Sequence, residues 1–386
     1  MGVAEDAVPF RQFVLKLHSR CNLSCEYCYM YELSDQGWRA QPRRMSERTV
    51  DRVAERIAEH ARRHALRELE LVLHGGEPLL AGAGLIRRAV LGVRGAVGDG
   101  VTVTARVQTN GVLLDDAMLS LLGELDVRIG VSLDGGPQEH NRHRVRANGR
   151  GSHAEVTAGL WRLRDRRFRR LFSGLLCTID LRNDPVATYE ALIVHAPPVV
   201  DFLLPHGNWD DRPPGRGRGP DTPYADWLIA VFERWYSAPA VETRVRLFSE
   251  IIGLLLGGRS GTEAVGLSPV ALAVVETDGS VEQVDSLKSA FAGAAGTALH
   301  VEKDSFDAAL EHPGIRARQA GIASLSTECR ACPIVRICGG GLYAHRFGKG
   351  NGFANPSVYC RDLERLIRHI DGVLQKDLSR LPKAIR

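Results

Sequence analysis

Seven of the eight cysteines in this 386-residue chain fall into two clusters whose spacing suits metal binding. Three lie near the N-terminus and four near the C-terminus: Cys21, Cys25, Cys28, Cys329, Cys332, Cys338 and Cys360. Thiolates are soft ligands, which select zinc, copper(I) or iron–sulfur clusters. The eighth cysteine, Cys177, stands alone in the apolar segment 175–179 and is predicted to be a core residue.

The N-terminal motif Cys21-x3-Cys25-x2-Cys28 directly follows a predicted strand. Structural zinc normally takes four ligands, whereas a [4Fe–4S] cluster held by three thiolates keeps one iron open for a small molecule. The carboxyl end of a parallel strand is also where α/β barrels place their chemistry. These features favour an iron–sulfur cluster over an incidental zinc site or free thiols.

The C-terminal motif consists of Cys329-x2-Cys332-x5-Cys338, followed by Cys360. Its four thiolates could hold either a zinc ion or a fully ligated iron–sulfur cluster. The spacing alone does not decide between these two kinds of site.

Strands and helices alternate over the first half of the chain. Parallel βαβ units follow from such an alternation, and six units predict a partial (β/α)6 barrel of the TIM type rather than a full eightfold barrel. A loop is expected at 211–223, which is rich in Pro, Gly and Arg, and a hairpin is expected to turn at Asp278-Gly279. The six predicted strands cover 13–17, 69–73, 101–108, 127–132, 171–179 and 199–204.

The formal net charge of +4 gives no argument for nucleic-acid binding. The sequence has no stretch of about 18 apolar residues, so we expect no membrane span. The first residues also lack the basic and then apolar pattern of a signal peptide. We therefore expect a cytoplasmic protein.

Further motifs accompany the N-terminal cysteines. Tyr27 precedes the third cysteine, Gly75-Gly76-Glu77-Pro78 follows the second strand, and Ser132-Leu133-Asp134-Gly135 follows the fourth. With these motifs, roughly residues 10–205 resemble the radical S-adenosylmethionine (SAM) enzymes. The resemblance implies that Cys21, Cys25 and Cys28 bind a [4Fe–4S] cluster whose open iron chelates SAM. Enzymes of this family cleave SAM to a 5′-deoxyadenosyl radical, which abstracts a hydrogen atom from the substrate.

The same resemblance implies contacts to SAM. The adenine of SAM is expected to lie near Tyr27, and its amino group near Gly75, Gly76 and Glu77. Its ribose is expected to lie near Ser132. Arg144 resembles the position that pairs with the SAM carboxylate, with a surface arginine as the alternative. Asn110 follows the third strand and either faces the substrate or fills an ordinary Asn-Gly turn.

The C-terminal cysteines resemble a ligand set of the SPASM extension, which carries auxiliary [4Fe–4S] clusters in peptide-modifying radical SAM enzymes. They match the outer auxiliary cluster. Val284 and Leu342 stand where cysteines of an inner cluster are expected, so the resemblance predicts one auxiliary cluster. We accordingly expect a radical SAM partial barrel with a connecting segment over 1–240 and a SPASM-like domain over 241–386.

Asp285 directly follows Val284. In sulfatase-maturing relatives an aspartate at the matching place acts as a general base, and a carboxylate near the substrate could accept the proton that is lost when a radical adduct is oxidised. The alternative is an exposed aspartate at the end of a hairpin.

The stretches HGGEPLL, LLPHGNWD and VVETDGSVEQVDSLKSAF closely resemble the FxsB-type maturases. That subgroup modifies ribosomally made precursor peptides and joins the Cβ of one residue to an aromatic ring two positions earlier, which forms a cyclophane. The alternatives are another radical SAM peptide modification, namely a thioether or ether crosslink, epimerisation or dehydrogenation, and a non-catalytic metal-binding protein.

The implied partners are a precursor peptide with its leader and an electron donor such as flavodoxin or ferredoxin. Residues 141–170 contain ten arginines opposed only by Glu155 and Asp165, so this segment carries a net charge of +8. It could bind an acidic leader, although such a run is more often a solvated helix face.

Overall fold

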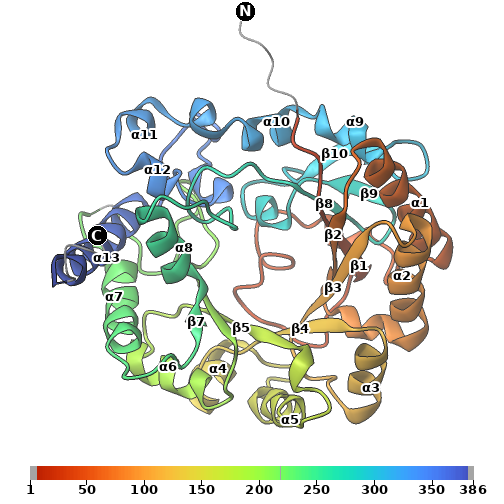
Figure 1. Cartoon of the computed structure of the whole chain (residues 1–386), viewed down its shortest axis with the longest axis horizontal. Helices are drawn as coiled ribbons and strands as arrows, with labels where there is room; N and C mark the ends of the chain where they lie inside the picture. Colours follow the sequence, from red (N-terminus) through yellow and green to blue (C-terminus); the bar gives the residue numbers. More distant parts are fainter. Residues whose placement is uncertain (1–6, 218, 381–386) are drawn as a thin grey trace, which may run out of the picture. The chain divides into compact units, whose positions relative to one another are not determined.

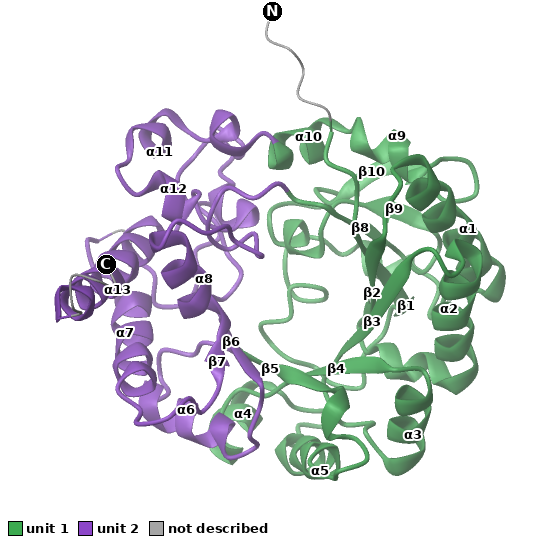
Figure 2. Ribbon diagram, viewed as in Figure 1, with its two compact units in different colours: residues 1–177, 270–319 green, residues 178–269, 320–386 purple. Residues whose placement is uncertain are grey.

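The computed structural model describes residues 7–217 and 219–380 (Figure 1). The chain divides into two compact units, and each consists of two segments (Figure 2). Unit 1 contains residues 1–177 and 270–319, and unit 2 contains residues 178–269 and 320–386. The predicted domain boundary at residue 240 coincides with none of the three boundaries between these segments and stays a prediction.

Unit 1 is built on a sheet in which each neighbouring pair among the strands β1 to β5 runs in the same direction. Its first five strands follow the chain in order: β1 (Gln12–His18), β2 (Glu68–Gly75), β3 (Thr102–Thr109), β4 (Val127–Ser132) and β5 (Phe172–Thr178). They lie within a few residues of the predicted strands. The expected α/β fold with a parallel sheet is therefore confirmed.

Five helices connect these strands: α1 (Glu47–Arg63), α2 (Gly82–Val97), α3 (Asp116–Glu124), α4 (Pro137–His143) and α5 (His153–Leu163). The start of α1 shows why the sequence forms a helix here. The side chain of Ser46 accepts a hydrogen bond from the backbone N–H of Thr49, which would otherwise lack a helical partner. Val53 and Ile57, one turn apart, are then buried on one face of the helix.

A strand from much later in the chain extends the sheet of unit 1. β8 (Leu272–Val275) pairs in parallel with β1, on the side opposite β2. β9 (Ser280–Glu282) returns antiparallel to β8, as the predicted hairpin requires, and β10 (Gly296–His300) pairs with β9. The hairpin is confirmed. Its pairing with the first strand was not predicted, because sequence periodicity carries no information about which strands pair.

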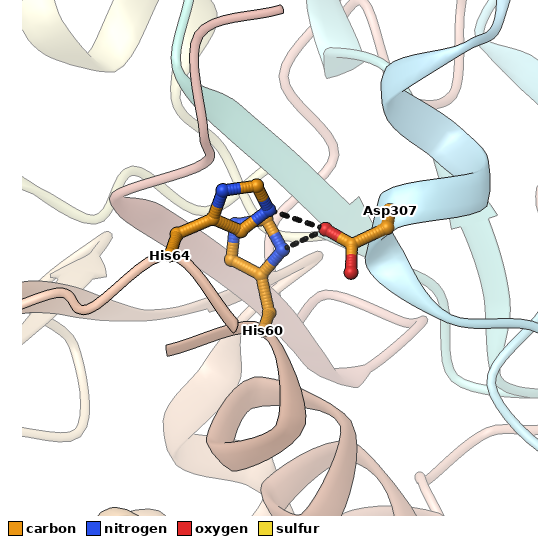
Figure 3. Close-up of side chains that lie close together, drawn as sticks. All are labelled: His60, His64 and Asp307. Atoms are coloured by element: carbon orange, nitrogen blue, oxygen red, sulfur yellow. Dashed lines mark hydrogen bonds and ion pairs between the residues drawn. The ribbon is translucent and has the colours of Figure 1, made fainter. Parts of the chain in front are cut away.

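His60 on α1 and His64, the residue directly after α1, bond to a carboxylate of α9 (Phe306–Leu310) in unit 1 (Figure 3). His60 Nδ1 and His64 Nε2 lie 2.8 and 2.6 Å from the same oxygen, Asp307 Oδ1. Two ligand atoms on one metal, with bonds of about 2.0–2.1 Å at right angles, would lie about 2.9 Å apart. These shorter distances are those of hydrogen bonds, so we interpret the group as a structural clamp.

Unit 2 contains a short parallel pair, β6 (Val199–Leu203) and β7 (Arg244–Val245). Its longer helices are α6 (Pro185–Ile193), α7 (Pro223–Tyr236), α8 (Arg246–Leu255) and α13 (Cys360–Arg380). The predicted loop is confirmed, since residues 211–217 and 219–222 contain no helix or strand. Across the described residues, we find no helix with the length and apolarity that a bilayer span requires.

Candidate active site and cysteine clusters

Cys21, Cys25 and Cys28 lie together in the loop that follows β1, and none forms a disulfide. Burial raises the pKa of each thiol to about 11, and electrostatic repulsion from a neighbouring cysteine of the same motif contributes to each shift. Holding all three as thiolates at neutral pH therefore requires a positive partner. A set of three soft sulfur ligands that need a cation fits an iron–sulfur cluster.

Asn110, at the end of β3, supports this cysteine loop. Its side-chain amide donates to Asn22 Oδ1 at 2.7 Å and to Cys21 Sγ at 3.5 Å, and its carbonyl accepts from the backbone N–H of Val112. Gly111 has a φ of +83°, as the turn alternative anticipates. Contact between Asn110 and a substrate stays a prediction.

Gly75 and Gly76 allow the end of β2 to approach the same loop. A Cβ atom on Gly75 would lie 2.3 Å from the backbone oxygen of His18, and one on Gly76 would lie 2.6 Å from the backbone of Arg20. The N–H of Gly76 donates to that His18 oxygen at 2.8 Å. Any larger side chain would push the two segments apart, which gives these glycines a steric reason in addition to their expected contact with SAM.

Glu77 is completely buried beside the glycines and receives three hydrogen bonds. The donors are Leu79 N at 3.0 Å, Thr109 Oγ1 at 2.8 Å and Asn110 N at 2.8 Å. Burial nevertheless raises the pKa of Glu77 to about 7. Because a carboxylate offers about four acceptor positions, room remains for one more donor.

Tyr27, Asp134 and Arg144 form a second group, in which Asp134 is buried and the other two are partly buried. The hydroxyl of Tyr27 donates to Asp134 Oδ2, and Arg144 Nε bonds to the same oxygen at 2.8 Å. The guanidinium of Arg144 also lies over the Tyr27 ring, 5.6 Å from its centroid. The surface alternative for Arg144 is thus wrong, because its side chain is only 12 % exposed. Asp134, which the sequence marks only as part of the motif after the fourth strand, is the carboxylate that bonds to both Tyr27 and Arg144.

Ser132 ends β4 and accepts a hydrogen bond from Gln108 Nε2 at 3.1 Å. Gln108 lies on β3 opposite Gly130, where a Cβ atom would meet the Gln108 side-chain oxygen at 2.3 Å. The glycine thus leaves room for the glutamine that orients Ser132. No feature of the sequence pointed to Gln108, since its signal is the pairing register of two strands.

Asp285 begins the short helix η4 (Asp285–Ser289) and is 7 % exposed. Its Oδ1 lies 2.6 Å from Nζ of Lys16 on β1, and its Oδ2 lies 3.6 Å from Nδ1 of His74 on β2. The alternative of an exposed hairpin aspartate is therefore wrong. We did not single out Lys16 in the sequence. A lysine within an otherwise apolar strand does indicate a buried charge with a partner, because lysine is almost never fully buried unless it is paired.

The four C-terminal cysteines converge in unit 2. Cys329 lies in α11 (Thr327–Ala331), Cys338 ends α12 (Val335–Cys338), and Cys360 begins α13. Burial raises the pKa of Cys360 to about 12, and electrostatic repulsion from Cys338, Cys329 and Cys332 adds to the increase. Four thiols so close together need a bound cation to ionise, which fits a metal centre with four sulfur ligands.

An arginine and three glycines complete this second site. The guanidinium of Arg346 donates to the carbonyl oxygens of Gly339, Gly340 and Gly341 at 2.7, 3.0 and 2.7 Å. Its positive charge opposes the increase in the pKa of Cys338. Cys177, by contrast, is buried in β5 as a core residue, which confirms the prediction.

Comparison with known proteins places residues 15–190 in the Radical SAM superfamily. The chain is 25% identical over 356 residues to a serine-type anaerobic sulfatase-maturating enzyme of Klebsiella aerogenes, a match that covers 89% of this chain and 82% of that protein. Native anSMEcpe with bound AdoMet and the Kp18Cys peptide has a similar fold, with a TM-score of 0.80 at 20% identity over 96% of this chain and 99% of that one.

Streptococcus suis SuiB bound to its precursor peptide SuiA is a more distant structural relative, with a TM-score of 0.55 at 13% identity over 88% of this chain and 73% of that chain. The superfamily match spans the cysteine loop, Gly75 to Glu77, and the group around Asp134. Taken together, the superfamily match over residues 15–190 and the similarity to sulfatase-maturating enzymes indicate a peptide-modifying enzyme of the radical SAM type, which binds a [4Fe–4S] cluster and SAM.

Proposed function

We propose that this enzyme is a maturase of a ribosomally synthesised precursor peptide and forms an intramolecular cyclophane crosslink in it. The observation that carries the proposal is the buried carboxylate of Asp285, which lies in the same compact unit as the three-cysteine loop. Peptide-bound relatives of the same fold, anSMEcpe and SuiB, support a peptide as the substrate. The subgroup resemblance supports the cyclophane.

The residues around the cysteine loop have assigned roles in this proposal. When bound, the cluster and SAM supply a 5′-deoxyadenosyl radical, which removes a hydrogen atom from the Cβ of one residue. Glu77 pairs with the SAM ammonium through its remaining acceptor position, and the partly buried Arg144 pairs with the SAM carboxylate. Tyr27 packs beside the adenine and Ser132, oriented by Gln108, approaches the ribose.

Asp285 acts as the general base. Once the carbon radical has added to the aromatic ring and one electron has been removed, the ring carbon must lose a proton to restore aromaticity. A buried carboxylate that is held by a lysine accepts this proton without competition from bulk water.

The C-terminal cysteines would hold one auxiliary [4Fe–4S] cluster, which when bound would supply an acceptor for that electron. A single zinc ion with Zn–S bonds of about 2.3 Å would place its sulfur ligands about 3.8 Å apart. Among the described residues, the groups of three or more ligand atoms within 4.8 Å of one another contain no cysteine. The wider sulfur spacing therefore favours a multi-iron cluster over zinc.

The partners of the enzyme are a leader peptide and an electron donor such as flavodoxin or ferredoxin. The end of α5 and the residues after it expose Trp161 together with several arginines, and the guanidinium of Arg164 lies 4.5 Å from the centre of the Trp161 ring. A surface that combines positive charge with an aromatic ring suits an acidic leader.

Anaerobic reconstitution with dithionite, SAM and the peptide of a neighbouring short reading frame tests the proposal. We expect 5′-deoxyadenosine, a peptide that has lost two hydrogens, and about eight irons per chain, four for each cluster. A desaturated peptide would share this mass but lack the aromatic-to-Cβ bond, which two-dimensional NMR detects. An unchanged mass would point to epimerisation, about four irons would assign zinc to the C-terminal site, and absence of 5′-deoxyadenosine would refute the enzymatic role.

A further inference from the structure

The carboxylate of Asp285 belongs to a larger buried group of charges in unit 1. Lys16 Nζ lies 2.6 Å from Asp285 Oδ1 and 2.7 Å from Glu276 Oε1. Lys288 Nζ lies 2.9 Å from the same Glu276 oxygen and 2.8 Å from Glu282 Oε1. Five ionisable side chains therefore form an unbroken chain of short contacts from Asp285 to Glu282.

The charges of this group are shielded from solvent and do not cancel. Lys16 is completely buried, and only Glu282, at 13 %, has a side chain more than a tenth exposed. Three carboxylates and two ammonium groups leave one negative charge in excess, so the group becomes neutral when it binds one proton. Buried charges are costly unless they are paired and hydrogen-bonded, and a cluster that lacks one proton is suited to accept one.

The sheet brings these residues together. Lys16 on β1 is directly paired with His74 on β2, and the parallel pairing of β1 with β8 ends at Leu15 and Val275, the residues just before Lys16 and Glu276. Glu282 comes from β9, and Asp285 and Lys288 come from η4. Residues more than 250 positions apart in the sequence thus form one polar layer because the late hairpin joins the first strand.

We propose that Lys16 is a positioning residue and that Asp285, Lys16, Glu276, Lys288 and Glu282 form a relay through which the substrate proton leaves. This inference rests on the proposed function. The C–H bond of the oxidised ring adduct breaks, its electron pair restores the aromatic ring, and the proton passes to Asp285. Lys16 accepts this proton as it gives one to Glu276, and Lys288 repeats the transfer to Glu282.

Glu282 is the exit of the relay. It is the most exposed member, and burial together with the charge of Glu276 raises its pKa to about 7, so it exchanges protons with water at physiological pH. Besides the five members of the relay, the titratable groups that face it from the surrounding elements are Tyr29, Tyr31 and His74.

The test measures modified peptide formed per 5′-deoxyadenosine, because the relay acts after SAM cleavage. We expect Lys16→Met to lower this ratio at least tenfold while 5′-deoxyadenosine still forms. The double variant Lys16→Met/Asp285→Asn should be no worse than Asp285→Asn alone, as for residues that act as a unit. If Lys16→Met fails to fold, Glu282→Gln provides the test in its place, because it keeps the size of the side chain.

The pH dependence separates the relay from a structural role. In the wild type the ratio should fall below about pH 7, because protonated Glu282 cannot accept a proton. In Glu282→Gln it should be low and independent of pH. Thermal unfolding of each variant reports on the fold, with Asp307→Asn as a matched control that breaks the partly buried clamp between α9 and the end of α1. The control should lower the unfolding temperature and leave the ratio unchanged.

Two results would overturn the relay: a wild-type ratio in both Lys16→Met and Glu282→Gln, or a proportional loss of peptide product and 5′-deoxyadenosine in both. Failure of the wild-type enzyme to modify the peptide at all, with 5′-deoxyadenosine still formed, would refute the proposed function and the relay with it. The wild-type control thus distinguishes the two failures.

Discussion

The two cysteine clusters are held in different ways. The N-terminal three lie in a loop that is supported by residues from the ends of neighbouring strands, including Gly76 after β2 and Asn110 after β3. The C-terminal four depend on short helices, the start of α13 and the carbonyl oxygens that bind Arg346. Three thiolates supported by a sheet leave a ligand position for SAM, whereas four thiolates form a closed site suited to electron transfer.

Cysteine substitutions should give the largest separation between the two clusters. We expect Cys25→Ala to lower 5′-deoxyadenosine formation by at least about 1000-fold, because the radical cannot form without the first cluster. Cys332→Ala should leave 5′-deoxyadenosine formation within about threefold of the wild type while the modified peptide disappears. Iron content and anaerobic product analysis measure both; loss of 5′-deoxyadenosine in Cys332→Ala would show that the clusters do not have separate roles.

Glycine substitutions test the two supports. In Gly76→Ala the new Cβ would lie 2.6 Å from the backbone of Arg20, and in Gly339→Ala it would lie 1.7 Å from the backbone oxygen of Gly266 at a φ of +60°. Each should cost about 3 kcal/mol or more of folding free energy, because backbone atoms must move.

The difference between the two glycine variants lies in function. Gly76→Ala should weaken SAM binding, while Gly339→Ala should spare it. Gly84→Ala, whose Cβ would meet nothing within 4 Å, is the matched control. Denaturant unfolding and equilibrium dialysis of SAM measure the two effects, and equal SAM affinity in both variants would contradict a sheet-supported SAM site.

The smallest expected effect is a pH dependence confined to the first cluster. Burial raises the pKa of Glu77 to about 7, but SAM requires the carboxylate, so binding should weaken by up to about tenfold per pH unit below pH 7. Because folded Glu77 holds its proton more tightly than the unfolded chain, the SAM-free protein should also lose stability as the pH rises from about 4.5 to about 7.

Glu77→Gln is the test of this titration. It should bind SAM weakly at every pH between 6 and 8, measured by dialysis against the reconstituted protein. A slope that persists in the variant would assign the titration to another group.

Much of unit 1 could be predicted from the sequence because its signals are local. Apolar strands alternate with amphipathic helices, so β1 to β5 were found within a few residues of their ends. Parallel strands present their carboxyl ends at one edge of the sheet, which is where we expected the chemistry to lie. The contacts of Asn110 with Cys21 and Glu77 agree with that expectation.

The missing part was long-range pairing. Strand periodicity identified the hairpin at Asp278-Gly279, but nothing in its residues names β1 as the partner of β8. The burial of Asp285 and the role of Lys16 depend on that pairing, so neither could be predicted from the sequence. Arg144 could not be distinguished from the surrounding surface arginines for a different reason, because its partner Asp134 becomes its neighbour only through α4.

By itself the sequence indicated the cysteines that can ligate metal, the approximate bounds of the parallel strands β1 to β5 and the chemical class of the enzyme. These follow from side-chain chemistry and from patterns that repeat over a few residues. Only the tertiary structure decided which charges are buried together. A lysine within an apolar strand acquires its meaning when a segment more than 250 residues away supplies the carboxylates that neutralise it, and that pairing is a property of the folded chain.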